Sequence, residues 1–407
     1  MKIMAITACL GLMGQTQPTP ESLLSDPRFQ ERVIPSPNDP AQWPAFQSEL
    51  IAYRDAIRQQ LNYSDALYRD PKTAWSATAF SCGFIMLNDS VIYDPTTNQF
   101  TPDKFINEYM PQFGGFDCVV LWHAYPRLGF DDRNQFDFYK DQPGGLAGLK
   151  SLVDALHKHN VRVLLPYLPW DRSTRNDGTT HAQSLAACVK ALGADGVYLD
   201  TMDKATPELR KELDHLPSGM VYDSEGTTPI EDIAHHQNSW GQWVKDSDVP
   251  GVIRNKWIEP RHMVRIVERW DRDHSDEIAM AWMNGAGIVV WENVFGTWVG
   301  WNELDKSLLR GSLPVQRHFG NLFTGANLTP CVPTESPAIF ANRWQEPGVE
   351  LYTLVNRLID ERQGNLLKVP YKPGYRYFNL FSGDEITPID GQVILQGPIA
   401  GRALVVW

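Results

Sequence analysis

Two stretches decide the fold that this sequence predicts: LGADGVYLDTM at residues 192–202 and GMVYDSEG at residues 219–226. Each is a short apolar run that ends in acids, Asp200 in the first and Asp223 with Glu225 in the second. The residues between them are charged and helix-forming, with a proline placed where it suits a first helical turn. The pattern predicts strand, helix, strand, with acidic side chains at the carboxyl end of both strands.

The same alternation of apolar runs and helical segments extends along the chain on both sides of this unit. Strand–helix repeats at a spacing of about 30 residues are typical of a parallel α/β barrel. We therefore predict an α/β fold with a (β/α)8-type barrel. The expected strands lie at 80–87, 116–122, 161–167, 197–199, 220–222, 252–259 and 287–290, and no eighth run stands out before Pro330.

Segments of different character flank the predicted barrel. A helical pattern covers residues 40–68, and after Pro330 short apolar runs alternate with turns that contain glycine and proline. These changes predict an N-terminal helical segment and a small C-terminal antiparallel β-domain. The expected division is a signal peptide (1–16), an N-terminal arm and helix (17–75), the barrel (76–330) and the β-domain (331–407).

The first residues read as a signal for export. Lys2 is followed by an almost wholly apolar run at 3–13 and then by small residues, which is the order found in secretory signals. The run is too short to span a bilayer as a mature helix. We expect a secreted or periplasmic protein, with no membrane insertion after signal removal.

Charge and cysteine content exclude several classes of partner. The 407-residue chain has a formal net charge of -12 and no basic stripe, which argues against nucleic acid and anionic membranes. There is no CxxC or histidine-rich spacing and no convincing phosphate loop, so we expect neither a metal nor a cofactor. Cys82 and Cys118 fall in neighbouring predicted strands and are expected to be buried thiols.

Polar or ionisable residues end nearly every predicted strand. In a parallel barrel the carboxyl ends of the strands share one mouth, where these side chains should gather. Carboxylates that accept from hydroxyl groups, with aromatic rings that cover apolar sugar faces, suit an oligo- or polysaccharide. The residues expected to contact such a substrate are Trp122, His123, Trp170, Asp171, Arg172, Asp223, Glu259, Trp291, Glu292 and Asn293. The charged run at 268–277 is interpreted as a solvated face.

Two carboxyl groups at one mouth are also what glycoside hydrolysis requires. From Thr78 onward the chain resembles a retaining glycoside hydrolase with a TIM-type barrel, in the broad neighbourhood of the α-amylase superfamily and the α-galactosidase clan. Gly-Val-Tyr-Leu-Asp200 resembles the fourth strand of these enzymes, whose aspartate is the nucleophile. Tyr222-Asp-Ser-Glu225-Gly resembles the fifth strand of the amylase-like group, whose glutamate is the acid/base. The resemblance implies that Asp200 and Glu225 are the catalytic residues.

The chain also departs from the patterns of those families. Tyr198 stands two residues before Asp200, where the amylase group has arginine, and WEN at 291–293 replaces its His-Asp pair on the seventh strand. In the α-galactosidase clan the acid comes from the sixth strand, which points to Glu259. The acid/base is therefore open among Glu225, Glu259 and Glu292.

Two other functions fit parts of the pattern. A catalytically inactive carbohydrate-binding barrel would keep the fold and the aromatic residues. A lyase or isomerase acting on uronic acids would need a basic cluster for the substrate carboxylate, and only Arg172, Arg175 and Arg254 are candidates. The acids at the ends of two consecutive strands favour a glycosidase over both.

Overall fold

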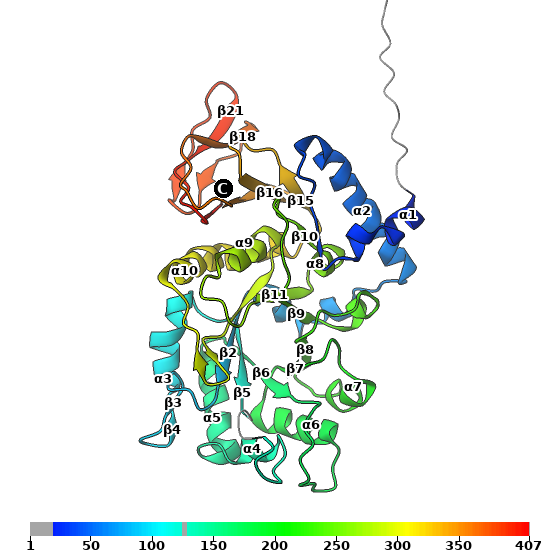
Figure 1. Ribbon diagram of the computed structural model, residues 1–407, viewed down its shortest axis with the longest axis vertical. Coiled ribbons are helices and arrows are strands. Elements are labelled where there is room, and N and C mark those ends of the chain that lie inside the picture. The colour runs from blue at the N-terminus through cyan, green and yellow to red at the C-terminus, as the bar shows by residue number, and fades with distance from the viewer. Residues whose placement is uncertain (1–18, 124–127, 407) are drawn as a thin grey trace, which may run out of the picture.

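The computed structural model describes residues 19–123 and 128–406, and its centre is a closed barrel of eight parallel strands (Figure 1). Neighbours in the barrel are consecutive barrel strands in the chain, and the last strand closes onto the first. This confirms the predicted (β/α)8-type barrel. The strands are β2 (Ser81–Met86), β5 (Cys118–Trp122), β6 (Arg162–Tyr167), β7 (Gly196–Leu199), β8 (Val221–Ser224), β9 (Asn238–Gln242), β11 (Met263–Val267) and β12 (Gly287–Val290).

The first five strands lie where the sequence predicts them, but the assignment from the sixth strand onward is wrong. The expected strand at 252–259 is β10 (Val252–Ile253) followed by a short helix, and both lie outside the barrel. Positions six and seven belong to β9 and β11, so the run at 287–290 is the eighth strand rather than the seventh. The sequence pattern missed β9 because it is rich in polar residues although all of them are buried.

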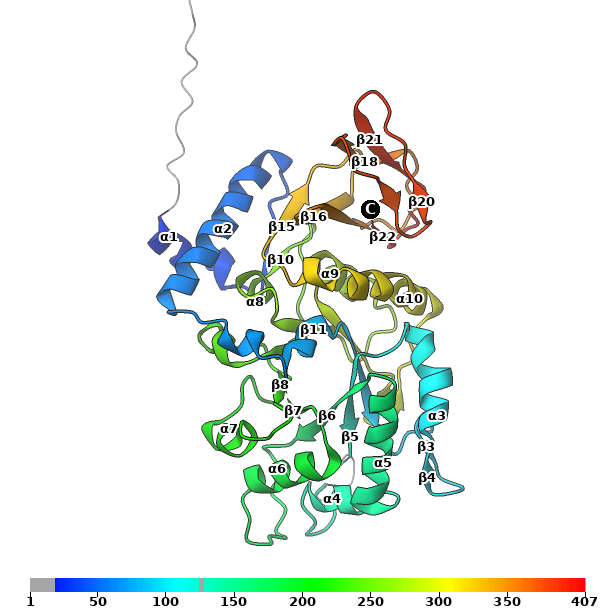
Figure 2. The same cartoon turned by 180° about the vertical axis from the view of Figure 1, so that it is seen from behind.

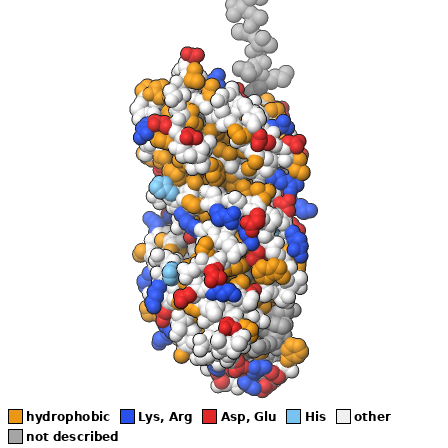
Figure 3. Space-filling model, turned by 90° about the vertical axis from the view of Figure 1, so that its left-hand side faces the viewer, with side chains coloured by type: hydrophobic (Ala, Val, Ile, Leu, Met, Phe, Trp, Pro, Cys, Tyr) orange, Lys and Arg blue, Asp and Glu red, His pale blue; other side chains and the backbone are white. Residues whose placement is uncertain are grey.

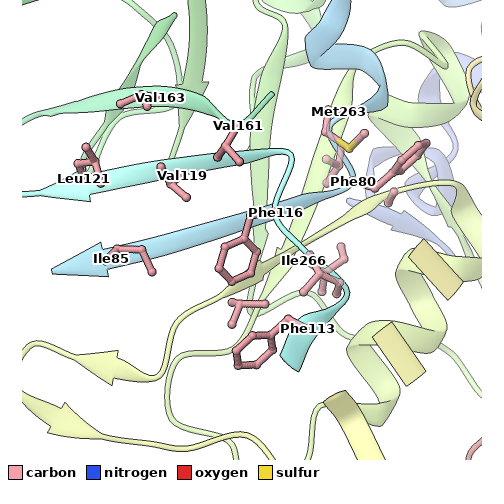
Figure 4. Close-up of a cluster of buried hydrophobic side chains, with 14 of the residues drawn as sticks. Phe80, Ile85, Phe113, Phe116, Val119, Leu121, Val161, Val163, Met263 and Ile266 are labelled. Carbon is pink, nitrogen blue, oxygen red and sulfur yellow. The ribbon is translucent and has the colours of Figure 1, made fainter. Parts of the chain in front are cut away.

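Side chains of the barrel strands alternate between a filled interior and an outer face. In β2, Phe84 and Met86 pack in the interior, whereas Ile85 packs on the outer face with Phe116 (Figure 4). Gly83 makes room for that ring, because a Cβ at this position would lie only 2.9 Å from Phe116. The barrel is therefore a packed core, not a pore.

Thiols and an ion pair also occupy the interior. Cys82 on β2 is in register with Cys118 on β5, and both thiols are free and buried, as the sequence predicts. Arg265 Nη1 donates to Asp223 Oδ2 at 2.6 Å, and neither side chain is exposed. Burial raises the pKa of Asp223, and the neighbouring guanidinium opposes that rise.

Helices cover the outer face, and their ends have local causes. Thr180 and Gln183 form a capping box at the start of α6, and Gly193 ends it with a φ of 72°. Thr206 caps the helix after β7, whose first residue is a proline. The helices are α3 (Pro102–Lys104), η5 (Phe105–Tyr109), η6 (Met110–Phe113), α4 (Asp137–Lys140), α5 (Gly145–Lys158), α6 (His181–Leu192), α7 (Pro207–Leu213), η7 (Ile230–His235), α8 (Arg254–Ile258), α9 (Ser275–Asn284), α10 (Glu303–His318) and α11 (Gly320–Phe323).

The N-terminal segment packs on the connection between β9 and β11. Val33 and Ile34 pair antiparallel with β10, and the Trp257 indole of α8 donates to the Leu50 carbonyl at 2.7 Å. Its long helix has a buried face that includes Leu50 and Tyr53. The segment contains α1 (Pro20–Ser25), η1 (Pro27–Gln30), β1 (Val33–Ile34), η2 (Pro40–Gln42), α2 (Trp43–Gln60), η3 (Ala66–Arg69) and η4 (Ala74–Thr78).

The C-terminal residues form the expected antiparallel β-domain (Figure 2). One sheet has four strands in the order β15, β16, β17 and β22, and two further pairs are β18–β21 and β19–β20. Asn342 Nδ2 ties the domain to α9 by donating to the Met283 carbonyl at 2.7 Å. The strands are β15 (Leu328–Val332), β16 (Ile339–Glu346), β17 (Val349–Asn356), β18 (Asn365–Pro370), β19 (Phe378–Asn379), β20 (Asp384–Glu385), β21 (Gln392–Gln396) and β22 (Leu404–Val406).

The two ends of the barrel have different surroundings. In Figures 1 and 2 the N-terminal helices and the β-domain lie at the upper end of the molecule, whereas α4 lies at the lower end. Because α4 follows β5, the lower end is where the barrel strands finish. The mouth of the barrel therefore faces away from the β-domain.

Two small hairpins extend from strand-to-helix connections, β3 (Tyr93–Asp94) with β4 (Gln99–Phe100) and β13 (Asn293–Val294) with β14 (Thr297–Trp298).

Candidate active site

The structure brings Asp200 and Glu225 together at the mouth. Asp200 directly follows β7, and Glu225 directly follows the neighbouring strand β8. Their backbones continue the sheet, because the Asp200 N–H donates to the Tyr167 carbonyl at 3.0 Å and the Glu225 N–H to the Leu199 carbonyl at 3.1 Å. The N–H of Thr201, next to Asp200, donates to Glu225 Oε2 at 2.6 Å. The two carboxyl groups therefore belong to one site.

Thr201 has a backbone conformation that is unusual for its side chain. Its φ is 57°, in the left-handed region that β-branched residues rarely adopt. Such conformations cost about 1–3 kcal/mol and cluster at functional sites. In this conformation the Thr201 N–H reaches the Glu225 carboxylate, so the unfavourable backbone geometry positions an acid of the site.

Asp200 is nearly buried, at 9% exposed, and has one direct side-chain donor. The Trp170 indole Nε1–H, from the loop after β6, donates to Asp200 Oδ2. Burial raises the pKa of Asp200, while the Trp170 hydrogen bond and the positive charge of Arg269 act in the opposite direction. Trp170 is therefore a partner of the acid as well as an exposed ring at the mouth.

Arg269 completes the site, although the sequence pattern placed it on a solvated face. It lies two residues beyond β11, and its Nη2 donates to Glu225 Oε1 and to Gln242 Oε1, the latter at 2.8 Å. Its guanidinium lies 5.3 Å from the ring centre of Trp243 and 5.2 Å from that of Trp291. Burial lowers the pKa of Arg269, and the nearby Tyr198 and Asp200 oppose this.

The interpretation of 268–277 as a solvated face holds for residues 270–273 and for Asp276, which are exposed, but not for the rest of the run. His274 and Glu277 are buried, and His274 Nδ1 lies 2.9 Å from Glu277 Oε2. The His274 ring stacks on Trp301, with ring centres 3.9 Å apart. These contacts could not be predicted from the sequence, because a run of charged residues has the same pattern whether it is exposed to solvent or buried at the end of a strand.

Trp122 and Trp291 form the floor of the site rather than exposed platforms for a substrate. They are only 2% and 4% exposed. Both pack on Phe84, with ring centres 5.3 Å away for Trp122 and 4.1 Å away for Trp291. The expectation that these two rings contact a substrate directly is therefore corrected to a supporting position beneath the acids.

Asp223 is likewise not a substrate contact. It points into the barrel interior from β8, where Arg265 binds its carboxylate and no part of the residue is exposed. Side chains two residues apart lie on the same face of a strand, so the two acids differ in depth: Asp223 lies within β8, whereas Glu225 lies beyond its last residue.

Glu259 lies at the opposite end of the barrel, so its expected place at the mouth is wrong. It precedes β11 by four residues, next to the start of that strand. Tyr63 of the N-terminal segment donates to Glu259 Oε2 at 2.5 Å, and Arg261 Nε donates to Oε1 at 2.7 Å. These hydrogen bonds hold the pKa of Glu259 below its usual value, although burial alone would raise it. Glu259 ties the N-terminal segment to the barrel.

His123 and Asp171 shape the loops of the mouth. Burial lowers the pKa of His123 to about 3, so the ring is neutral. Its Nε2 lies 2.7 Å from the Gln135 carbonyl, and the ring stacks on Tyr139. Asp171 is buried, which alone would raise its pKa, but N–H donors from Gln135 and Ser173 hold the pKa low.

Arg172 is exposed and donates to the Pro169 carbonyl at 2.8 Å, so it stiffens the loop after β6.

Glu292 and Asn293 brace the loop after β12. Glu292 Oε1 accepts from the Trp301 N–H at 2.9 Å and has Lys306 Nζ at 3.7 Å. Asn293 Nδ2 donates to Asp89 Oδ2 at 2.7 Å, which joins this loop to the one after β2. Glu292 is buried, and its contacts are those of a support.

Exposed aromatic rings surround the mouth, and most of them were not singled out from the sequence. They come from the connections that follow five different barrel strands, and Trp170, Trp243 and Trp270 lie within three residues of the strand end. Trp243, which is 59% exposed, also holds the Arg269 guanidinium over its ring. The exposed rings are Phe130, Trp170, Trp243, Trp270 and Trp298.

Within 19–123 and 128–406, no group of three or more His, Cys, Asp or Glu side chains has an arrangement that could hold a metal ion. In the same part of the chain no helix combines the length and apolar character needed to cross a bilayer. The predicted signal at 1–16 lies outside the described residues.

Comparison with known proteins identifies the fold. No model of a protein family and no curated protein matches the chain. Solved structures do match: an α-amylase from Anoxybacillus aligns with a TM-score of 0.55 at 11% identity, over 82% of this chain and 97% of its own. The α-amylase of Geobacillus thermoleovorans, solved with acarbose, gives 0.55 at 13% identity, over 82% and 98%. AmyP in complex with maltotriose gives 0.53 at 10% identity, over 83% and 98%.

These similarities cover 82–83% of this chain. The chain therefore has the overall fold of α-amylase-type glycoside hydrolases, as the resemblance of its fourth and fifth strands implies. At this level of identity the fold does not determine the chemistry, so the function must be argued from the site itself.

Proposed function

We propose that this protein is a glycoside hydrolase that cleaves an oligo- or polysaccharide with retention, with Asp200 as nucleophile and Glu225 as acid/base. The observation that carries the proposal is the meeting of two nearly buried carboxyl groups from consecutive strands at the mouth of the barrel. A retaining mechanism needs this pair, one group to attack the anomeric carbon and the other to protonate the leaving oxygen.

Asp200 is suited to attack because a hydrogen bond fixes the orientation of its carboxylate and leaves one oxygen for the sugar. Trp170 binds Oδ2, so the second oxygen is the one available to form the covalent glycosyl bond. The carboxyl must be ionised to attack, and burial works against ionisation. Trp170 and Arg269 counter that effect and keep the nucleophile in its anionic form over a wider pH range.

Glu225 must begin the reaction protonated, yet both of its contacts favour the anion. Arg269 binds one oxygen and the Thr201 N–H binds the other. We propose that the entering sugar separates Arg269 from Glu225, and that Gln242, which already accepts from the same nitrogen, then holds the arginine. The acid thereby gains its proton only when the site is occupied.

Among the three candidates for the acid/base, we prefer Glu225 because of its position in the barrel. Glu259 is at the far end of the barrel, and Glu292 is engaged with the Trp301 backbone and Lys306. Only Glu225 combines a place at the mouth with a direct link to the residue beside Asp200.

The substrate class follows from the surroundings of the pair. Exposed indole rings after β6 and β9 lie on either side of the acids, since Trp170 binds Asp200 and Trp243 stacks on the arginine that binds Glu225. Rings placed this way suit the apolar faces of sugar units. Because similar structures hold acarbose and maltotriose, α-linked glucose oligomers are the first substrates to test.

The test is turnover by two variants with a matched control. Asp200→Asn should fold normally and lose nearly all turnover, because no glycosyl intermediate can form. Glu225→Gln should keep part of its activity on aryl glycosides with good leaving groups, and azide should partly restore the rest. Asp203→Asn, which removes an exposed acid from the same loop, should match the wild type.

Two results would contradict the assignment. If Glu292→Gln shows azide rescue and Glu225→Gln does not, the acid/base is Glu292. If the wild type binds oligosaccharides but never turns them over, the protein is a carbohydrate-binding barrel. The ion pair between Arg269 and Glu225 is the observation that favours this second candidate, because a permanent pair would block acid catalysis.

We also propose that residues 1–16 are removed on export and that the protein works outside the cytoplasm. The polysaccharide substrate and the apolar run behind Lys2 support this. N-terminal sequencing of the native protein tests it, and an intact Met1 on a cytosolic protein would refute it.

A further inference from the structure

Aromatic rings enclose the Arg269 guanidinium at the mouth of the barrel. The ring centres of Trp243, Trp291 and Phe295 lie 5.3, 5.2 and 5.8 Å from its central carbon. An arginine packs on aromatic rings through its flat face, and its N–H groups point outward in the plane of the guanidinium. Because the Arg269 side chain is only 13% exposed, a partner for these N–H groups has to lie within the site.

The hydrogen-bonding capacity of Arg269 is only partly used. Both hydrogen bonds that it makes to the described residues, to Glu225 and Gln242, come from Nη2. Within residues 19–123 and 128–406, its Nε is buried and has no acceptor. A buried N–H group without an acceptor is costly, and such groups are rare in native proteins. This edge of the guanidinium is therefore available to an acceptor that a ligand brings.

The charges around Arg269 change when the acid/base is ready for catalysis. Glu225 must begin protonated, yet it is the only carboxylate among the described residues that bonds to Arg269. The other acid, Asp200, acts on Arg269 through its charge and uses its carboxylate to accept from Trp170. With Glu225 protonated, a largely buried guanidinium is left without a bonded anion, which is strongly unfavourable.

The chemistry of the ligand decides whether this charge is compensated. The hydroxyl groups of a neutral sugar are acceptors without charge. A carboxylate on the sugar is planar, presents two oxygens to an edge of the guanidinium, and carries the negative charge that Glu225 loses on protonation. An acidic sugar therefore satisfies Arg269 in the protonation state that catalysis requires, and a neutral sugar does not.

We propose that the sugar unit bound beside Asp200 and Glu225 is a uronic acid, whose carboxylate replaces Glu225 as the partner of Arg269. The proposal rests on the proposed function for the reaction at this site, and it narrows the substrate to acidic oligo- or polysaccharides. Gln242 keeps its bond to Nη2. Glu225, now beside a carboxylate instead of a guanidinium, takes one proton from the solvent and becomes the acid.

The net charge of the chain is compatible with an acidic substrate. On the face drawn in Figure 3, acidic and basic side chains are interspersed from the middle of the molecule to its lower end. The formal net charge of -12 is therefore not gathered on this face as one negative field. Salt also screens long-range repulsion, because the Debye length is about 8 Å at physiological ionic strength.

The first experiment compares matched substrates. Nitrophenyl glucosides and glucuronides of both anomers differ only at the sixth carbon of the sugar, and galactose and mannose pairs extend the panel. kcat/KM is measured for the wild type, Arg269→Met, Arg269→Lys and the control Arg272→Met. Arg272 is an exposed arginine three residues further along the same connection. Thermal unfolding checks that each variant is folded.

We expect the wild type to prefer a uronide over its neutral counterpart by about 10- to 100-fold in kcat/KM, the size of one hydrogen bond between charged groups. Arg269→Met should lower kcat/KM for the uronide more than for the neutral glycoside, so that the preference disappears. Arg269→Lys should retain part of the preference and Arg272→Met all of it. A wild type that prefers the neutral glycosides, or a preference that survives in Arg269→Met, overturns the proposal.

The second experiment measures binding and needs no turnover. Free glucuronate, galacturonate and mannuronate are titrated into the wild type by calorimetry, in buffers with different ionisation enthalpies, with the neutral sugars as reference. We expect uptake of about one proton per uronate bound at neutral pH, and binding without uptake in Glu225→Gln. No binding of any uronate, or binding to the wild type without uptake, overturns the proposal. Uronate binding with proton uptake, but no turnover of any glycoside, supports the ligand class and refutes the hydrolase.

Discussion

Replacing Arg269 by methionine tests how the two acids of the site divide their roles. Methionine keeps much of the apolar stem that packs near Trp243 and Trp291 but removes the charge beside Glu225. The Thr201 N–H remains as the second donor to the carboxylate. The change therefore removes the charged hydrogen bond to Glu225, together with the hydrogen bond to Gln242, in a site where the Arg269 and Glu225 side chains are at most 13% exposed.

The size of the effect follows from the bond to Glu225. A hydrogen bond between charged groups contributes about 1.5–3 kcal/mol, and roughly 1.4 kcal/mol corresponds to one pH unit of titration. The basic limb of kcat/KM, which reports loss of the proton from the acid, should move up by about one to two pH units. The acidic limb should move less, because Arg269 lowers the pKa of Asp200 only through its charge and without a hydrogen bond.

The assay is a pH profile of kcat/KM on an oligosaccharide with a poor leaving group, whose cleavage needs protonation. Arg269→Lys keeps the charge and should shift the basic limb less than Arg269→Met does. Arg172→Met is the control, because this exposed arginine of the mouth bonds to the Pro169 carbonyl and not to an acid. A folded Arg269→Met protein whose basic limb stays in place would refute the role given to Glu225.

Three further outcomes follow from other contacts. Trp170→Phe removes the donor to Asp200, so the pKa of that carboxyl should rise and the acidic limb of kcat/KM should move up by about one pH unit, with the basic limb unchanged. Arg265→Met leaves Asp223 buried without its partner and should lower the free energy of unfolding by about 3–5 kcal/mol in denaturant melts, and an unchanged midpoint would contradict the ion pair. Burial and then the neighbouring acids raise the pKa of Glu277 to about 10, above its unfolded value, so its contribution to stability is complete below about pH 4.5 and falls as the pH rises toward 10. Glu277→Gln should therefore gain up to about 5 kcal/mol over the wild type at pH 8 and little at pH 4, measured by thermal unfolding, and a gain independent of pH would exclude this cause.

The barrel could be predicted from sequence because its first five strands are apolar runs separated by clear helices. The prediction failed where the interior itself is polar. β9 carries Asn238, Ser239 and Gln242, and β11 carries Arg265 at its centre, so neither resembles a buried strand. Conversely, the segment at 252–258 is apolar because it packs against the N-terminal helices, not because it belongs to the barrel.

The two acids of the candidate site, Asp200 and Glu225, could be predicted from the sequence, but Arg269 could not. Asp200 and Glu225 follow recognisable strands, and the position of a strand end is a local property of the sequence. Arg269 follows a strand that was not recognised, and its partner Glu225 is 44 residues earlier in the chain. Side-chain direction is the other limit: Asp223 and Glu259 had the right chemistry, but only the register of β8 and the location of β11 show that neither faces the mouth.

The pairing of β1 with β10 has a consequence for how the chain is made. Val33 meets Ile253, Leu50 accepts from Trp257, and Gln47 Nε2 donates to the carbonyl of Pro330 at 2.7 Å. During synthesis the N-terminal segment must therefore remain without its partners on β10 and α8 until six of the eight barrel strands have left the ribosome. Contacts so distant in sequence form slowly, and the segment exposes its apolar face in the meantime. Chains that stop before residue 253 should therefore be bound by chaperones and degraded by proteases, because the N-terminal segment has neither β10 nor α8 to pack against.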